Sequence, residues 1–139
     1  MKLNKSLLLI LITILTSFSL TSLFYTYYII QDVQELNMKL KVGDVVGLDT
    51  NESVISFGII PPRGGSSERR IILENMENRP LKVYIKKSGE IAEWVYISED
   101  NFILNKNEKK ELLFTAIPPK DAEKGAYKGK VKFIFTRVI

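Results

Sequence analysis

The first 30 residues and the rest of the chain differ sharply in the pattern of their apolar and polar positions. Residues 6–30 form a run of 25 positions without a charged side chain. A helix of this length spans roughly 37 Å, which exceeds the ~30 Å hydrocarbon core of a bilayer. The run therefore predicts one N-terminal transmembrane helix.

Beyond residue 38, short stretches in which apolar and polar residues alternate predict β-strands. The stretches are 39–48, 53–59, 69–75, 81–87, 91–98, 102–104, 111–117 and 128–138. Short strands separated by turn-forming residues are typical of two antiparallel sheets packed face to face. We therefore expect an all-β domain at residues 39–139, an immunoglobulin-like antiparallel β-sandwich of about seven strands. Residues 31–38 are expected to form a polar stalk before it.

The charges that flank the apolar run predict its orientation. Lys2 and Lys5 precede the run, and Asp32 and Glu35 follow it. Lysines near a helix end favour the cytoplasmic side. We therefore expect residues 1–5 to be cytoplasmic and the domain to be exported, in a single-pass protein of the cell membrane.

Two other interpretations of the run also place the domain outside the cytoplasm. One is a cleaved signal peptide with a small-residue cleavage site at Ser17–Ser19. The other is a leader that resembles those of type IV pilins. That resemblance is incomplete, because Lys5-Ser6 lacks the usual glycine or alanine and no carboxylate occurs before Asp32.

Composition restricts the partners of the domain. Two of the 20 basic side chains and none of the 16 acidic ones lie in the first 30 residues, so the remainder carries 18 against 16. A net charge of +2 gives no electrostatic reason to expect nucleic acid as a partner. The chain contains no cysteine and no histidine. Disulfides, Ser-His-Asp and Cys-His catalysis and the usual zinc sites are therefore excluded, and we expect no cofactor, no metal and no enzymatic activity.

Several landmarks align with one family of modules. They are Phe57-Gly58, Arg70–Asn75, Pro80-Leu81, Trp94–Ser98, Phe102 and the stretch Pro118–Gly129. Over roughly residues 49–135, the chain resembles the immunoglobulin-like sandwiches of the abnormal-spindle/Hydin and major-sperm-protein type, which recur in archaeal and bacterial envelope proteins. The resemblance implies a non-catalytic interaction module and supplies no catalytic residues.

Four residues are expected to serve the fold. Trp94 is predicted to fill the centre between the sheets, because one large ring buries much apolar surface. Gly125 and Gly129 flank Tyr127 at the entry to the last strand. This arrangement resembles a tyrosine corner, in which the hydroxyl bonds to a nearby loop carbonyl.

Two groups of basic residues are candidates for partner binding. Lys128, Lys130 and Lys132 share one face of the last strand, where they suit lipid headgroups, acidic glycans or an acidic protein. Alternatively, these lysines protect an edge strand from aggregation. Arg63 and Arg69 flank a Gly-Gly-Ser-Ser loop that resembles a phosphate cradle but lacks the Walker ending. A connection between strands is the simpler interpretation of that loop.

Two polar stretches permit further chemistry. The acidic turn Glu99–Asn101, with Glu90 and Glu93 nearby in sequence, contains oxygen ligands but has no calcium-loop spacing, so a solvated turn is the simpler interpretation. Asn51 begins an Asn-Glu-Ser sequon, which makes it a possible glycosylation site on an exported domain.

These observations predict a membrane-anchored, non-catalytic binding module. Its most concrete form is an accessory subunit of a cell-envelope complex with a protein partner at the outer membrane surface. The alternative is a structural subunit that binds copies of itself in a surface filament or surface layer.

Overall fold

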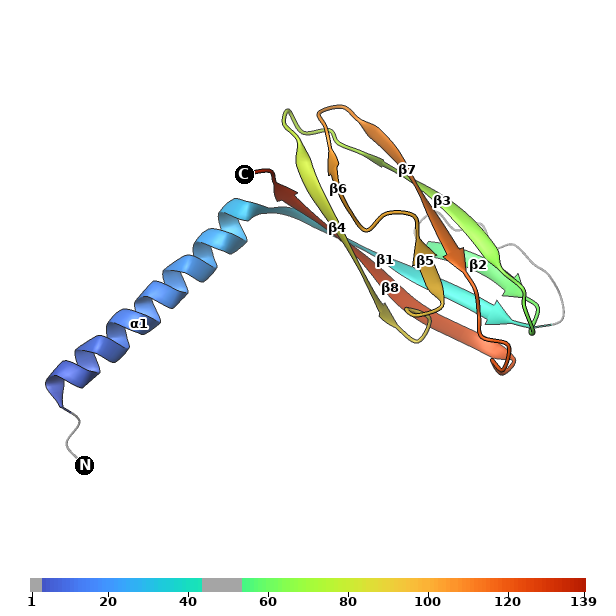
Figure 1. Cartoon of the computed structure of the whole chain (residues 1–139), viewed down its shortest axis with the longest axis horizontal. Helices are drawn as coiled ribbons and strands as arrows, with labels where there is room; N and C mark the ends of the chain where they lie inside the picture. Colours follow the sequence, from blue (N-terminus) through green and yellow to red (C-terminus); the bar gives the residue numbers. More distant parts are fainter. Residues whose placement is uncertain (1–3, 44–53) are drawn as a thin grey trace.

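The computed structural model describes residues 4–43 and 54–139. An N-terminal helix leads directly into a domain built only of strands (Figure 1). The elements are the α-helix α1 (Lys5–Phe24), its π-helical last turn η1 (Tyr25–Ile29), and the strands β1 (Ile30–Val42), β2 (Val54–Ile60), β3 (Ser67–Glu74), β4 (Leu81–Gly89), β5 (Val95–Ile97), β6 (Asn101–Leu104), β7 (Lys109–Ala116) and β8 (Gly125–Arg137).

The helix carries its apolar side chains entirely on its surface. None of the residues of α1 is buried against the domain. With its π-helical turn, the segment Lys5–Ile29 is long and apolar enough to cross a membrane, and its N-terminal position also suits a signal sequence. The helical segment ends where Ile30 adopts an extended backbone and enters β1.

The strands form two sheets, as the alternating pattern predicts. The five-stranded sheet has the order β2-β1-β8-β4-β6, and the three-stranded sheet has the order β3-β7-β5. Neighbouring strands are antiparallel except for β1 and β2, which run parallel. The two sheets face each other as a β-sandwich.

Alternation along each strand sends one set of side chains into the space between the sheets. Phe57, Phe114 and Phe133 are the largest side chains that are fully buried there. They pack with the other inward-facing apolar residues of the core, which include Met38, Leu40, Val42, Val83, Leu104, Leu112 and Val131. The core therefore draws on both sheets.

Residues 31–38 form part of a strand and not a stalk. Residues 32–38 pair with β8, from Asp32 opposite Phe135 to Met38 opposite Gly129. Met38 is fully buried in the core. The polar residues that suggest a stalk lie at outward-facing positions of β1 and in its exposed first part. The sheet thus begins at Ile30, immediately after the helix.

The predicted strand over 91–98 is shorter in the structure, and Trp94 does not fill the centre of the core. A tight turn occupies residues 90–94, where the Trp94 amide donates to the Ile91 carbonyl at 3.0 Å. Only Val95–Ile97 remain as β5. The Trp94 ring is half-buried at the rim of the core and lies edge-on to Tyr127, with 4.8 Å between ring centroids.

The entry to β8 has the bond that a tyrosine corner requires. The Tyr127 hydroxyl donates to the Glu123 carbonyl at 2.8 Å. Gly129 is sterically required, since a Cβ there lies only 2.9 Å from the Ile91 side chain and 3.1 Å from Met38. Gly125 differs, because a Cβ at that position meets no atom within 4 Å.

Asn75 joins two turns at the helix end of the sandwich. It is 2% exposed. Its side-chain Nδ2 donates to the carbonyls of Arg79, Leu104 and Asn105 at 2.8–3.0 Å, and its Oδ1 accepts from the Glu77 amide at 3.0 Å. One buried amide thereby satisfies backbone groups of both the β3–β4 and the β6–β7 turns.

Candidate binding faces of the sandwich

The three predicted lysines of β8 lie together on the outer side of the five-stranded sheet. Lys128, Lys130 and Lys132 are exposed and alternate with buried core residues. β8 lies in the middle of its sheet, between β1 and β4. Protection of an edge strand therefore does not explain these lysines, and β8 has no free edge for pairing with a partner strand.

Neighbouring strands add further lysines to the same side. Residues opposite each other in adjacent strands project from the same face of a sheet. Lys39 on β1 lies opposite Lys128, and Lys86 on β4 lies opposite Lys132. We call this surface the basic face; its lysines are Lys39, Lys41, Lys82, Lys86, Lys128, Lys130 and Lys132.

The outer side of the three-stranded sheet has a different charge pattern. Arg70 pairs with Glu111 at 3.8 Å, and Lys109 pairs with Glu74 at 3.2 Å. Opposite charges thus balance on this side, whereas lysines predominate on the other. The near-neutral composition of the domain conceals this separation of charge between its two faces.

Glu35 on β1 pairs with two lysines of the basic face, Lys130 and Lys132. Its Oε1 lies 2.9 Å from the Lys130 Nζ, and its Oε2 lies 3.6 Å from the Lys132 Nζ. The hydrogen bond from Lys130, supported by the charges of both lysines, holds the pKa of the Glu35 carboxyl below its usual range. Because this pKa is lowered in the folded protein, the interaction stabilises the fold above about pH 4.3 and is lost as the pH falls through the lowered pKa.

Replacing Lys130 by glutamine is expected to raise the pKa of Glu35 towards its ordinary value. The Lys132→Gln change is expected to raise it less, because the Lys132 contact is longer. An NMR titration of the Glu35 side-chain carboxyl measures both shifts, with Lys41→Gln as a control on the same face. A larger shift for Lys132→Gln than for Lys130→Gln contradicts the assignment.

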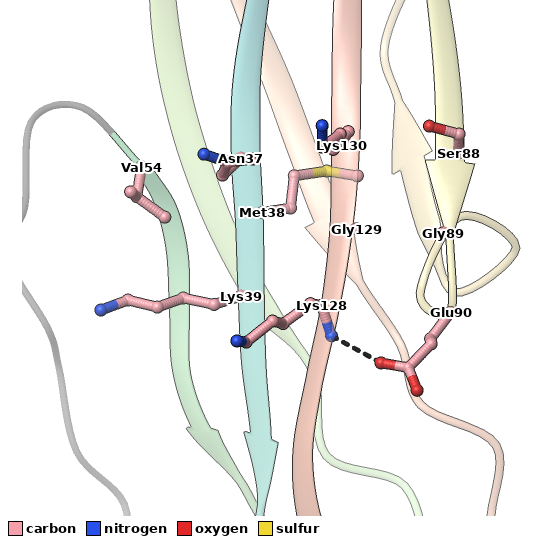
Figure 2. Close-up of a pocket in the computed structure, with 10 residues that line it drawn as sticks. All are labelled: Asn37, Met38, Lys39, Val54, Ser88, Gly89, Glu90, Lys128, Gly129 and Lys130. Atoms are coloured by element: carbon pink, nitrogen blue, oxygen red, sulfur yellow. Dashed lines mark hydrogen bonds between the residues drawn. The ribbon is translucent and has the colours of Figure 1, made fainter.

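A hollow of about 560 Å³ lies within the basic face, bordered by Asn37, Lys39, Ser88, Lys128 and Lys130 among others. Figure 2 shows the lysines of β1 and β8 on one side of it and Glu90 on the other. The Glu90 Oε2 accepts the backbone amide of Lys128 at 3.0 Å. This carboxylate thus ties the end of β4 to β8, and three of the ten residues that line the hollow are lysines.

The two predicted arginines do not join the basic face. Arg69 is half-buried at the sandwich edge, where its Nε donates to the Ser56 carbonyl at 2.5 Å. It therefore links β3 to β2 and serves the fold. Arg63 is exposed in the β2–β3 turn, with a left-handed backbone φ of 68°. The structure thus separates the two side chains that suggest a phosphate cradle.

The outer side of the three-stranded sheet carries an apolar stripe that sequence reasoning missed. Ile72 on β3, Leu113 on β7 and Tyr96 on β5 lie on adjacent strands, diagonally across the sheet register. Ile72 is 64% exposed and Tyr96 is 59% exposed. Their neighbours Arg70 and Glu111 add charges beside them. The stripe depends on which strands are adjacent, so no local pattern reveals it.

The acidic stretches show no metal site in the described parts of the chain. Among residues 4–43 and 54–139, no three carboxylates are grouped closely enough to hold an ion. Glu99 instead pairs with Lys110 at 2.7 Å. The possible glycosylation site Asn51 lies outside the described residues.

Two arginines at the base of the domain were also missed. The Arg137 guanidinium stacks over the Tyr28 ring at 4.5 Å, and the Arg79 Nη2 donates to the Gln31 Oε1 at 2.7 Å. These contacts hold the end of the helical segment and the start of β1 against the sandwich.

Three surfaces of the molecule are candidates for binding: the apolar helix, the basic face and the apolar stripe. Comparison of the chain with protein-family models, with curated proteins and with solved structures found no match. The two-sheet sandwich agrees with the fold expected from the resemblance to abnormal-spindle/Hydin and major-sperm-protein modules, and membership of that family has no further support.

Proposed function

We propose that the protein is a non-catalytic binding module that its N-terminal helix holds at a cell membrane. In this proposal the helix remains uncleaved, residues 1–5 are cytoplasmic and the sandwich is exported. The flanking charges described above support this orientation. The helix itself supports anchoring because its apolar residues find no partner in the domain.

The apolar stripe is the observation that favours a protein partner. Protein interfaces combine exposed aromatic and aliphatic residues at the centre with a polar rim. Tyr96, Leu113 and Ile72 supply such a centre, and Arg70 and Glu111 supply part of a rim. We therefore propose that the protein is an accessory subunit of an envelope complex, and that the stripe contacts its partner.

The absence of histidine and cysteine supports a binding role. The resemblance to abnormal-spindle/Hydin and major-sperm-protein modules adds to this proposal, because members of that group are generally interaction modules.

Site-specific photo-crosslinking in native membranes tests the proposal. A photoreactive residue at position 72 is expected to capture a different membrane or exported protein, and Leu113→Glu is expected to abolish that product. The matched control Met76→Glu changes an exposed apolar residue in the β3–β4 turn and is expected to preserve the product. A thermal melt of each variant checks that the domain remains folded.

Other outcomes separate the competing interpretations. Crosslinks only between copies of the chain favour the filament or surface-layer subunit. A product that survives Leu113→Glu in a folded variant contradicts the stripe as the contact surface.

A further inference from the structure

The sandwich is joined to the helix without a flexible connection. Ile29 ends the helical turn and is buried, and Ile30 begins β1. The Arg137–Tyr28 and Arg79–Gln31 contacts brace the same junction. The direction in which the domain faces is therefore coupled to the direction of the helix.

Figure 1 shows which sheet faces the helix side. The strands β4 and β8 lie on the side of the sandwich towards the helix, and β3 and β7 lie on the far side. The outer side of the five-stranded sheet is the basic face. When the helix crosses a bilayer, the basic face is thus turned towards the membrane surface and the apolar stripe is turned away from it.

The basic face also has apolar residues where it approaches the helix. Val33, Ile134 and Tyr84 lie opposite one another on β1, β8 and β4. Ile103 on β6 follows near this row, opposite Lys82. Surfaces that bind membranes peripherally combine such apolar and aromatic groups with lysines. The row lies between Lys82, near the junction, and the other lysines of the basic face.

Charge complementarity identifies the occupant. Lys86 on β4 lies opposite Lys132 on β8, which places like charges together and is unfavourable in an isolated sheet. The negative charge of an anionic leaflet removes this cost. Each lysine near the leaflet surface raises the ratio of docked to undocked protein about fivefold. We propose that the basic face docks on the anionic headgroup layer of the membrane that holds the helix. This inference rests on the membrane anchoring proposed above.

Single cysteines provide the test, because the chain contains none. The full-length protein is placed in nanodiscs of phosphatidylcholine, with or without phosphatidylglycerol, and a fluorophore is attached at Ser88→Cys, Ile72→Cys or Ser17→Cys. Lipids with nitroxide headgroups are expected to quench the Ser88 label, on the basic face, several-fold more than the Ile72 label, on the far face. The difference is expected only with phosphatidylglycerol and to shrink at high salt.

Paired substitutions test the role of charge. Removing Lys86 and Lys128 with glutamine is expected to lower the ratio of docked to undocked protein about 25-fold, at about fivefold for each lysine. The matched control replaces Lys106 and Lys120, two exposed lysines in turns outside the strands, and is expected to leave the ratio unchanged.

The fluorophore at Ser17→Cys, in the helix, distinguishes a failure of this inference from a failure of the proposed function. Quenching of the Ser17 label by nitroxides on the acyl chains shows an inserted helix. If that label is quenched and the Ser88 label remains aqueous, docking is wrong and anchoring stands. If the Ser17 label is aqueous, the anchor itself is wrong. Equal quenching at Ser88 with and without phosphatidylglycerol overturns the recognition of charge.

Discussion

Replacing Phe114 by alanine is expected to lower the free energy of unfolding by about 3–5 kcal/mol, the usual cost of removing a buried ring. Phe114 is fully buried and lies edge-on to Phe133 of the opposite sheet, with 6.3 Å between ring centroids. The substitution opens a cavity between the two sheets. Urea unfolding followed by the fluorescence of Trp94, the only tryptophan, measures the change.

Two further variants show whether the loss arises between the sheets. Phe18→Ala removes an exposed ring of α1 and is expected to leave the stability of the domain unchanged. A double-mutant cycle with Phe133→Ala is expected to show a coupling of about 0.5–1.5 kcal/mol. A loss below about 1 kcal/mol for Phe114→Ala contradicts the described core.

Changing Asn75 to aspartate is expected to destabilise the domain by about 3–5 kcal/mol at neutral pH, the cost typical of an uncompensated buried charge. The substitution preserves the size of the side chain. It removes the Nδ2 donor and places a carboxylate against the carbonyls of Arg79, Leu104 and Asn105. Urea unfolding of the variant measures the loss.

The pH dependence of this variant has a defined sign. Burial and the facing carbonyls raise the folded-state pKa of the introduced carboxyl above its unfolded value of about 3.9. The variant is therefore least impaired below that value and loses stability as the pH rises towards the raised pKa. Asn78→Asp, at an exposed position in the same turn, is the matched control and is expected to have little effect.

The strands of the domain are predictable from the sequence where alternation is strong and local. Residues 81–87 alternate Leu81, Val83 and Ile85 with polar positions, and all three side chains are buried in β4. The beginning of β1 is not predictable from such alternation. Most of its residues up to Glu35 are polar, and pairing with β8 places them in the sheet.

The candidate binding faces depend on strand order, which local patterns do not encode. The spacing of Lys128, Lys130 and Lys132 shows that they share a face. It cannot show that Lys39 and Lys86 lie beside them, because those contacts join segments about 40–90 residues apart in the sequence. The contact of Arg69 is not encoded locally for a related reason, since its partner Ser56 belongs to a different strand.

The pairing of β1 with β8 has a consequence for the time at which the domain folds. Among the strands in the described residues, β1 is made first and β8 last, with Ile30 opposite Thr136. Contacts between distant segments form slowly, because the chain between them must first be ordered. A nascent chain that has not yet reached Gly125 leaves β1 without its antiparallel neighbour. The five-stranded sheet therefore closes only after β8 has been synthesised, and until then the apolar side of β1 needs protection from aggregation.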